Sequence, residues 1–285
     1  MSRPEKPNLL KWLYRLEEDG SFGMRTLLQR GAEAALEKDK MEAEAYAEAN
    51  VNAFCKYVIA AQDEDERRGL SRVLTVVDPA TYVFRWYSES NNLDSRRRRK
   101  LLRLRRRPAF LNMIDALTSR EYEALACVAM NAAGASKISL TPPGNEGGVD
   151  FFALLPTPGK CHLFGGGANP VRVVGQSKKY SQAVQVDKLK EFLTTLQEVK
   201  HRGEPKTEKI VPPWFHGVRG PIVGCVIAHS GYQAGATSRA RNHGVITADS
   251  LDVAEMLAMT KIFPEETDAA AQTRMCLEQL RAYLL

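Results

Sequence analysis

Residues 171–180 read VRVVGQSKKY and residues 148–155 read GVDFFALL, and these two stretches decide the fold class. Both are rich in β-branched or aromatic residues, and a connection containing PTPG and GGGANP separates them. This pattern predicts two neighbouring strands joined as a hairpin. A third run, IVGCVIAHS at 222–230, is continuously apolar and is typical of a strand in the middle of a sheet.

Helical patterns surround these strands. Thr118 is a helix N-cap candidate with Glu121 three residues later, and the apolar period that follows ends at Gly134. The other elements expected are a strand at 137–140, helices at 183–200, 235–242 and 251–261, a strand at 245–248, and an amphipathic helix at 265–285. The order predicts an α/β fold with a mixed β-sheet flanked by helices.

The first third of the chain has a different pattern. Residues 21–62 are rich in Ala, Glu, Leu, Lys and Met and contain no proline, which favours one long helix or a helix pair. The run YVFRWY at 82–87 is compatible with a short strand or with a buried helical turn. We therefore expect a mainly α-helical N-terminal recognition or docking region at 1–110, a catalytic domain at 111–262 and a C-terminal helix at 263–285.

The charge of the chain is concentrated in one segment. The 285 residues contain 40 Lys and Arg against 34 Asp and Glu, a net charge of +6, and residues 96–107 read RRRRKLLRLRRR. Without this run, 31 basic residues remain against 34 acidic ones. The run predicts a helix that binds a phosphate backbone, or that docks on a protein or another acidic surface. Its nine cations are Arg96, Arg97, Arg98, Arg99, Lys100, Arg103, Arg105, Arg106 and Arg107.

Other features bear on the compartment. The charged N-terminus does not resemble a signal peptide, and no run of 18 apolar residues occurs, so we expect a cytoplasmic protein that does not enter a membrane. The five cysteines are scattered, with no CxxC and no zinc-type spacing, and we expect them to be reduced.

Three polar side chains interrupt the two strands that decide the fold. By the strand period of two, Asp150 shares a face with Phe152, and Gln176 shares a face with Lys178. If those faces align, a carboxylate, a carboxamide and an ammonium group converge. Asp150 would then ligate Mg²⁺, Gln176 would add a neutral ligand or position water, and Lys178 would orient the attacking water in phosphodiester hydrolysis.

At these residues the sequence resembles the Mrr-like restriction endonucleases, a branch of the PD-(D/E)xK nuclease superfamily. The resemblance rests on EYE at 121–123, GGVD at 147–150 and QSK at 176–178, and extends over roughly residues 115–262. The superfamily's usual middle motif is acidic-x-Lys, whereas the Mrr-like branch carries Gln-x-Lys, as here. The resemblance implies a catalytic set of Asp150, Gln176, Lys178 and Glu123, with Asp150, Gln176 and Glu123 as metal ligands. Helical period alone does not choose between Glu121 and Glu123.

The resemblance implies a Mg²⁺-dependent DNA endonuclease, with Mn²⁺ as a substitute, acting in restriction or anti-phage defence. Cutting both strands needs two sites or two nicks, so a homodimer or larger assembly is expected, together with a defence-system partner protein. The alternatives are a catalytically inactive nucleic-acid-binding or assembly subunit on a nuclease fold, and a Holliday-junction or RNA nuclease.

Overall fold

The computed structural model divides the chain into two compact units, residues 1–112 and 113–285, and each is described by itself. The structure describes residues 5–17, 20–78, 83–86, 94–144, 148–156, 170–201, 210–264 and 267–285. Gly147 of the GGVD motif and Cys161 lie outside these ranges.

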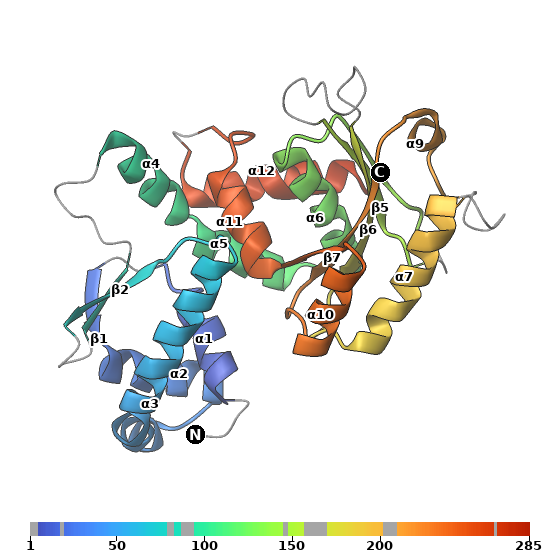
Figure 1. Cartoon of the computed structure of the whole chain (residues 1–285). Coiled ribbons are helices and arrows are strands. Elements are labelled where there is room, and N and C mark those ends of the chain that lie inside the picture. The colour runs from blue at the N-terminus through green and yellow to red at the C-terminus, as the bar shows by residue number, and fades with distance from the viewer. Residues whose placement is uncertain are drawn as a thin grey trace. The chain divides into compact units, whose positions relative to one another are not determined.

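The first unit is mainly helical, with a small sheet (Figure 1). Its helices are α1 (Glu5–Leu13), α2 (Met24–Leu36), α3 (Lys40–Arg67) and α4 (Ser95–Leu104), and α5 (Arg107–Ala116) crosses the boundary. Its strands are β1 (Gly20–Gly23), β2 (Leu74–Asp78) and β3 (Val83–Trp86), in the antiparallel order β1-β3-β2.

Two open points of the sequence reading are decided in this unit. The helical stretch is a pair, because α2 ends at Leu36 and the Asp39 side chain caps α3 by accepting from Glu42 N–H. The aromatic run contains a strand, β3, and the small sheet around it was not expected. Helix α4 ends at Leu104, and Pro108 lies in the first turn of α5, where a missing N–H costs nothing.

The second unit is built on a mixed five-stranded sheet, as expected. Its strands are β4 (Lys137–Leu140), β5 (Phe151–Leu155), β6 (Val171–Lys178), β7 (Ile222–Ala228) and β8 (Ile246–Asp249), in the order β4-β5-β6-β7-β8. The β4-β5 and β5-β6 pairs are antiparallel, and the β6-β7 and β7-β8 pairs are parallel. Its other helices are α6 (Ser119–Ala132), α7 (Val186–His201), α9 (Pro213–Gly217), α10 (Ala234–Asn242), α11 (Ser250–Met259) and α12 (Ala269–Ala282).

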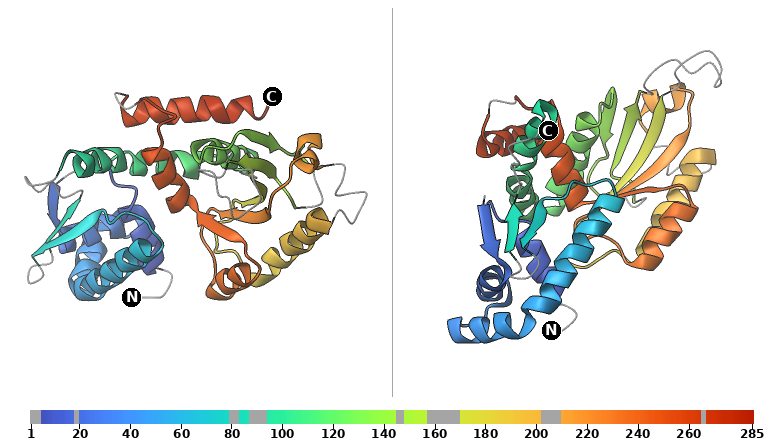
Figure 2. Two further views of the ribbon diagram at one scale, coloured as in Figure 1. Left: turned by 45° about the horizontal axis from the view of Figure 1, so that its top comes forward. Right: turned by 60° about the vertical axis from the view of Figure 1, so that its left-hand side comes forward.

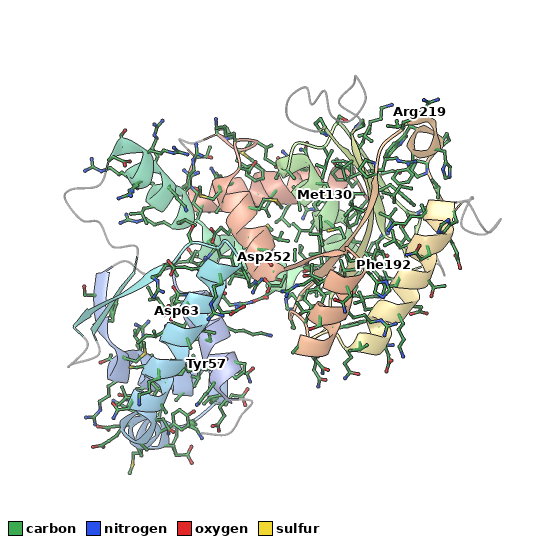
Figure 3. The ribbon with its side chains drawn as sticks, viewed as in Figure 1. Tyr57, Asp63, Met130, Phe192, Arg219 and Asp252 are labelled. Atoms are coloured by element: carbon green, nitrogen blue, oxygen red, sulfur yellow. The ribbon has the colours of Figure 1, made fainter. Side chains whose placement is uncertain are left out.

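Helices cover both faces of this sheet (Figure 2). On one face Phe152 and Val174 pack against α7, whose Phe192 is fully buried and is labelled in Figure 3. Gly224 in β7 leaves room for this ring, since a Cβ there would lie 3.1 Å from it. On the other face α6 contacts β4, β5 and β6, and α12 packs against α6. The C-terminal helix is thus part of the second unit.

Within the described residues, no helix is long and apolar enough to span a membrane. Four of the five cysteines are buried and not disulfide-bonded, namely Cys55, Cys127, Cys225 and Cys276.

One glycine makes room for an aromatic ring on the sheet. Gly175 pairs with Phe151 across the β5-β6 ladder, and a Cβ at this position would fall inside the Phe151 ring, which is fully buried. We predict that Gly175→Ala lowers the free energy of unfolding by about 1–3 kcal/mol, because the fully buried ring would have to move against the residues packed around it. Urea denaturation measures the change. Gly217→Ala is the matched control, since a Cβ there meets no atom within 4 Å, and equal destabilisation of both variants would contradict the packing argument.

Candidate active site

Asp150 and Gln176 lie at the end of the β5-β6 ladder. The register pairs Phe152 with Val174 and Phe151 with Gly175, and Asp150 and Gln176 come directly beyond the last pair. Val149 packs in the core cluster with Phe152 and Val174. Asp150 N–H donates to the Gly175 carbonyl at 2.8 Å. Ser177 N–H, which would otherwise continue the ladder, instead donates to Asp150 Oδ2 at 2.6 Å. The carboxylate is therefore fixed to the backbone of β6.

The environment of Asp150 opposes its ionisation. Burial raises the pKa of the Asp150 carboxyl to about 6, and the nearby charge of Glu123 acts in the same direction. The Ser177 N–H and the positive charges of Lys178 and Arg120 act against this rise. A carboxylate in this setting gains from a cationic ligand, because the ligand would offset the cost of burying its charge.

Only one of the two polar atoms of the Gln176 side-chain amide has a hydrogen-bond partner within the described residues. Its side chain is 2% exposed, and its Nε2 donates to the Gly148 carbonyl. Its Oε1 is buried and has no hydrogen-bond partner within the described residues. Gly148 is required here, because its φ is +65° and a Cβ would lie 2.7 Å from Gln176 Nε2. The amide is thus held at the end of β6 with a bare acceptor oxygen.

The two glutamates of α6 have different partners in the structure. Glu121 completes the capping box, accepting from the N–H and Oγ1 of Thr118 at 2.7 and 2.8 Å. Glu123 lies near enough to Asp150 for its charge to raise the pKa of that carboxyl. Of the two, only Glu123 therefore faces the candidate site.

Arg120 links Glu123 to the strand that carries Asp150, which sequence reasoning missed. Its Nη1 binds Glu123 Oε2 at 2.6 Å, and its Nη2 donates to the Thr141 carbonyl at 2.7 Å. Thr141 N–H in turn donates to the Asp150 carbonyl at 2.9 Å. The i,i+3 spacing of Arg120 and Glu123 on α6 is the only sequence signal for this pair, and it is common on any helix surface.

Lys178 lies at the end of β6, two residues after Gln176 and on the same face. Its charge favours ionisation of Asp150, and its Nζ lies 5.9 Å from the centre of the Tyr180 ring. The structure thus brings Asp150, Gln176, Lys178 and Glu123 together around one end of the β5-β6 pair.

The end of the neighbouring strand β7 carries a separate polar link. His229 Nε2 lies 2.8 Å from Asp115 Oδ1, and Lys179 Nζ donates to the Asp115 carbonyl at 2.9 Å. The hydroxyl of Tyr232 donates to the Val226 carbonyl at 2.6 Å. These contacts hold the β6 and β7 ends in place, and Tyr232 serves the fold through this bond.

A metal ion at this site would depend on a mixed set of oxygen donors. No group of three or more His, Cys, Asp or Glu side chains that could hold a metal occurs in the part of the chain that the structure describes. The donors that fit a hard cation are the carboxylates of Asp150 and Glu123 and the bare Oε1 of Gln176. Two carboxylates and an amide match Mg²⁺, which keeps several waters when proteins bind it.

The basic run forms α4 in the first unit, and its cations differ in exposure. The side chains from Arg96 to Lys100 are exposed, whereas Leu104 is 1% exposed. The prediction that Arg107 is displayed for a phosphate is wrong. Arg107 is 1% exposed, its guanidinium lies 5.5 Å from the centre of the Tyr14 ring, and its Nη1 donates to the Ser71 carbonyl. Arg107 is therefore part of the buried core of the first unit.

Comparison with protein families identifies the part of the chain around the site. Residues 114–206 match the family Mrr_cat, described as restriction endonuclease. The Mrr_cat match includes α6, β4, β5, β6 and α7, and with them all four candidate residues.

Three solved restriction endonucleases are similar to parts of this chain. MspJI in complex with a 27-mer oligonucleotide is 14% identical with a TM-score of 0.41, and the match covers 70% of this chain and 41% of MspJI. The modification-dependent AspBHI is 16% identical with a TM-score of 0.41, and the match covers 68% of this chain and 44% of AspBHI. FokI is 13% identical with a TM-score of 0.31, and the match covers 89% of this chain and 43% of FokI. The chain spans less than half the length of each of these proteins. No curated protein matches the chain.

The raised pKa of Asp150 predicts a pH-dependent cost in stability. The unfolded carboxyl titrates near 3.8 and the folded one near 6, so the folded state binds more protons between about pH 4 and pH 6, and wild-type stability falls as the pH rises through that window. Asp150→Asn keeps an acceptor for Ser177 N–H and removes the charge. In the presence of EDTA, it should be more stable than the wild type by about 3 kcal/mol at pH 7.5, with the gain disappearing towards pH 4.

Urea denaturation at both pH values measures this difference. Asp187→Asn is the matched control, because Asp187 is exposed and its ion pair with Lys190 at 2.9 Å lowers its pKa. The control should show no gain at pH 7.5. An Asp150→Asn protein that is no more stable than the wild type at pH 7.5 would contradict the prediction.

Proposed function

We propose that this protein is a Mg²⁺-dependent DNA endonuclease, with Mn²⁺ as a substitute, that hydrolyses phosphodiester bonds in restriction or anti-phage defence. One observation carries the proposal. In the part of the chain that matches Mrr_cat, the Asp150 carboxylate and the buried Gln176 amide with its bare oxygen lie at the end of the β5-β6 pair, which also carries Lys178.

The proposed metal ligands are Asp150, Gln176 and Glu123. When bound, the ion would polarise the phosphoryl oxygen and lower the pKa of a bound water. Ser177 N–H fixes the Asp150 carboxylate, and Gly148 fixes the Gln176 amide, so both ligands are oriented before the substrate arrives. Arg120 positions Glu123 through their 2.6 Å ion pair.

Lys178 supplies the cation nearest to the reaction. Its ammonium group orients the attacking water and offsets the negative charge that grows on the phosphoryl oxygens. The charge also favours the ionised form of Asp150, the form that ligates a cation. A lysine on a strand end next to a buried carboxylate serves both purposes.

The first unit is proposed to recognise or dock DNA through α4. The cap at Asp94, whose side chain accepts from Arg97 N–H at 2.7 Å, stabilises the start of the helix, and the exposed arginines follow directly. Such a surface holds a phosphate backbone without reading its sequence. A homodimer or larger assembly would place two sites on one duplex, and a defence-system partner protein would restrain them.

A plasmid nicking assay tests the activity. Wild-type protein should convert supercoiled plasmid to nicked or linear DNA with Mg²⁺ or Mn²⁺ and not with EDTA. Lys178→Ala should lower the rate by at least 100-fold, because the water loses its positioning group. Lys137→Ala, which removes an exposed lysine at the start of β4, is the matched control and should cut normally.

Two outcomes of this assay contradict the proposal. Wild-type protein that does not cut DNA would favour a binding or assembly subunit on a nuclease fold. Cutting that survives Lys178→Ala would show that the activity does not belong to this site. Substrates with a four-way junction or with RNA, run in parallel, distinguish the remaining nuclease classes.

The contribution of α4 is measured through the salt dependence of DNA binding. Replacing Arg96, Arg97, Arg98 and Arg99 by Ala should reduce the slope of log affinity against log salt by about 0.9 for each phosphate that the helix no longer neutralises. Fluorescence anisotropy with a labelled duplex in EDTA gives the slope. The control replaces four exposed cations elsewhere in the first unit, namely Arg25, Lys40, Lys56 and Arg67. Equal slopes for wild type and the α4 variant would contradict the assignment.

A further inference from the structure

A hollow lies directly beyond the end of β6, next to Lys178. Its volume is about 540 Å³, within the range of about 300–1,000 Å³ typical of ligand pockets. It lies between the segment that follows β6 and the first turn of α7. The lining residues are Lys179, Tyr180, Ser181, Gln182, Ala183, Gln185 and Lys188.

The chemistry of this lining suits an anion with hydrogen-bonding groups. Two of the seven lining residues are lysines, three carry a hydroxyl or amide in the segment after Tyr180, and none is acidic. Asp187 lies in the same helical turn but is paired with Lys190 at 2.9 Å. Gln185 and Lys188 also flank the start of α7, where backbone N–H groups add partial positive charge.

The segment that forms the hollow is held by its neighbours. Lys179 Nζ donates to the Asp115 carbonyl, and Ser230 Oγ donates to the carbonyls of Tyr180 and Ser181 at 2.9 and 3.1 Å. Val184 N–H donates to the Gly231 carbonyl at 2.9 Å and its own carbonyl accepts from Gln233 N–H at 3.0 Å. A surface fixed in this way pays little ordering entropy when a ligand binds.

The hollow also adjoins the candidate active site. Tyr180 lines it with a ring that is 39% exposed, and the same ring has Lys178 Nζ at 5.9 Å from its centre. A polymer with a phosphate near Lys178 would therefore extend its next backbone groups into the hollow.

We propose that this hollow, lined by Lys179, Tyr180 and Lys188 and their neighbours, binds the sugar-phosphate backbone of DNA beside the bond that is cut. The inference rests on the proposed function and adds a substrate-binding subsite to the same domain. Lys179 and Lys188 contact phosphate oxygens, and the amides of Gln182 and Gln185 donate to the backbone. The subsite holds the strand in position and reads no sequence, because its contacts are to groups that every nucleotide shares.

The test measures binding and cutting separately. In EDTA, anisotropy with a fluorescein-labelled duplex should show a slope of log affinity against log salt that is smaller by about 0.9 for Lys188→Ala than for the wild type. The wild type should then lose about 3.5-fold more affinity than this variant between 50 and 200 mM salt. Lys137→Ala is the matched control, since Lys137 is an exposed lysine of the same unit that lies outside the hollow.

A second variant distinguishes the loss of a positive charge from a folding defect in Lys188→Ala. Lys179→Gln retains a donor for the Asp115 carbonyl and removes the charge, and it should reduce the slope by a similar amount. Circular dichroism melting checks that each variant is folded. In the nicking assay with Mg²⁺, Lys188→Ala should raise the DNA concentration needed for half-maximal rate and leave the maximal rate within about twofold of the wild type.

The outcomes distinguish this inference from the proposed function. If Lys188→Ala and Lys179→Gln keep the wild-type slope, or if the wild type does not bind the duplex, the subsite is overturned. If both variants have a reduced slope but the wild type never cuts DNA, the subsite stands and the endonuclease proposal fails. A slope reduced in Lys137→Ala as much as in Lys188→Ala would show that the effect comes from general surface charge and would also overturn the subsite.

Discussion

The hydrogen bond from Ser177 N–H to Asp150 Oδ2, 2.6 Å long, is the interaction on which the candidate site depends. It replaces the next rung of the β5-β6 ladder, so the strand pair ends with a carboxylate in place of a backbone carbonyl. This position lies next to Gln176, within electrostatic reach of Lys178 and Glu123. Gly175 makes the geometry possible, because without a side chain it admits the Phe151 ring against the sheet.

The site costs stability in order to be prepared for a ligand. Asp150 is buried with its pKa raised to about 6, and the oxygen of the Gln176 amide has no partner within the described residues. Each feature is unfavourable in a protein whose only task is to fold, because a buried charge and a buried bare acceptor both lose their hydration. A cation between them would recover both losses, and the lysines beyond β6 would receive the anionic polymer that comes with it.

Local patterns predicted most of the elements and part of the site. The capping box at Thr118 and Glu121, the β-branched and aromatic content of 148–155 and 171–180, and the apolar run of β7 are local features of the chain. The structure has the corresponding helix and strands. Prediction from the sequence failed where contacts between residues far apart in the chain determine the position of a side chain. Arg107 was grouped with eight other cations, yet contacts with Tyr14 and Ser71, far from it in sequence, bury it, and Arg120 gave no signal that distinguished it from an ordinary helix arginine.

The sequence by itself determined the order of helices and strands, the mixed sheet and the identity of the residues that could carry chemistry, because periodicity and capping are local properties of the chain. Only the tertiary structure decided which glutamate of α6 faces Asp150, how deeply that carboxylate is buried, and that the segment after β6 is held as a cationic hollow by Asp115, Ser230 and Gly231. The physical reason is that burial and charge pairing depend on contacts between segments far apart in sequence, and no local pattern records those contacts.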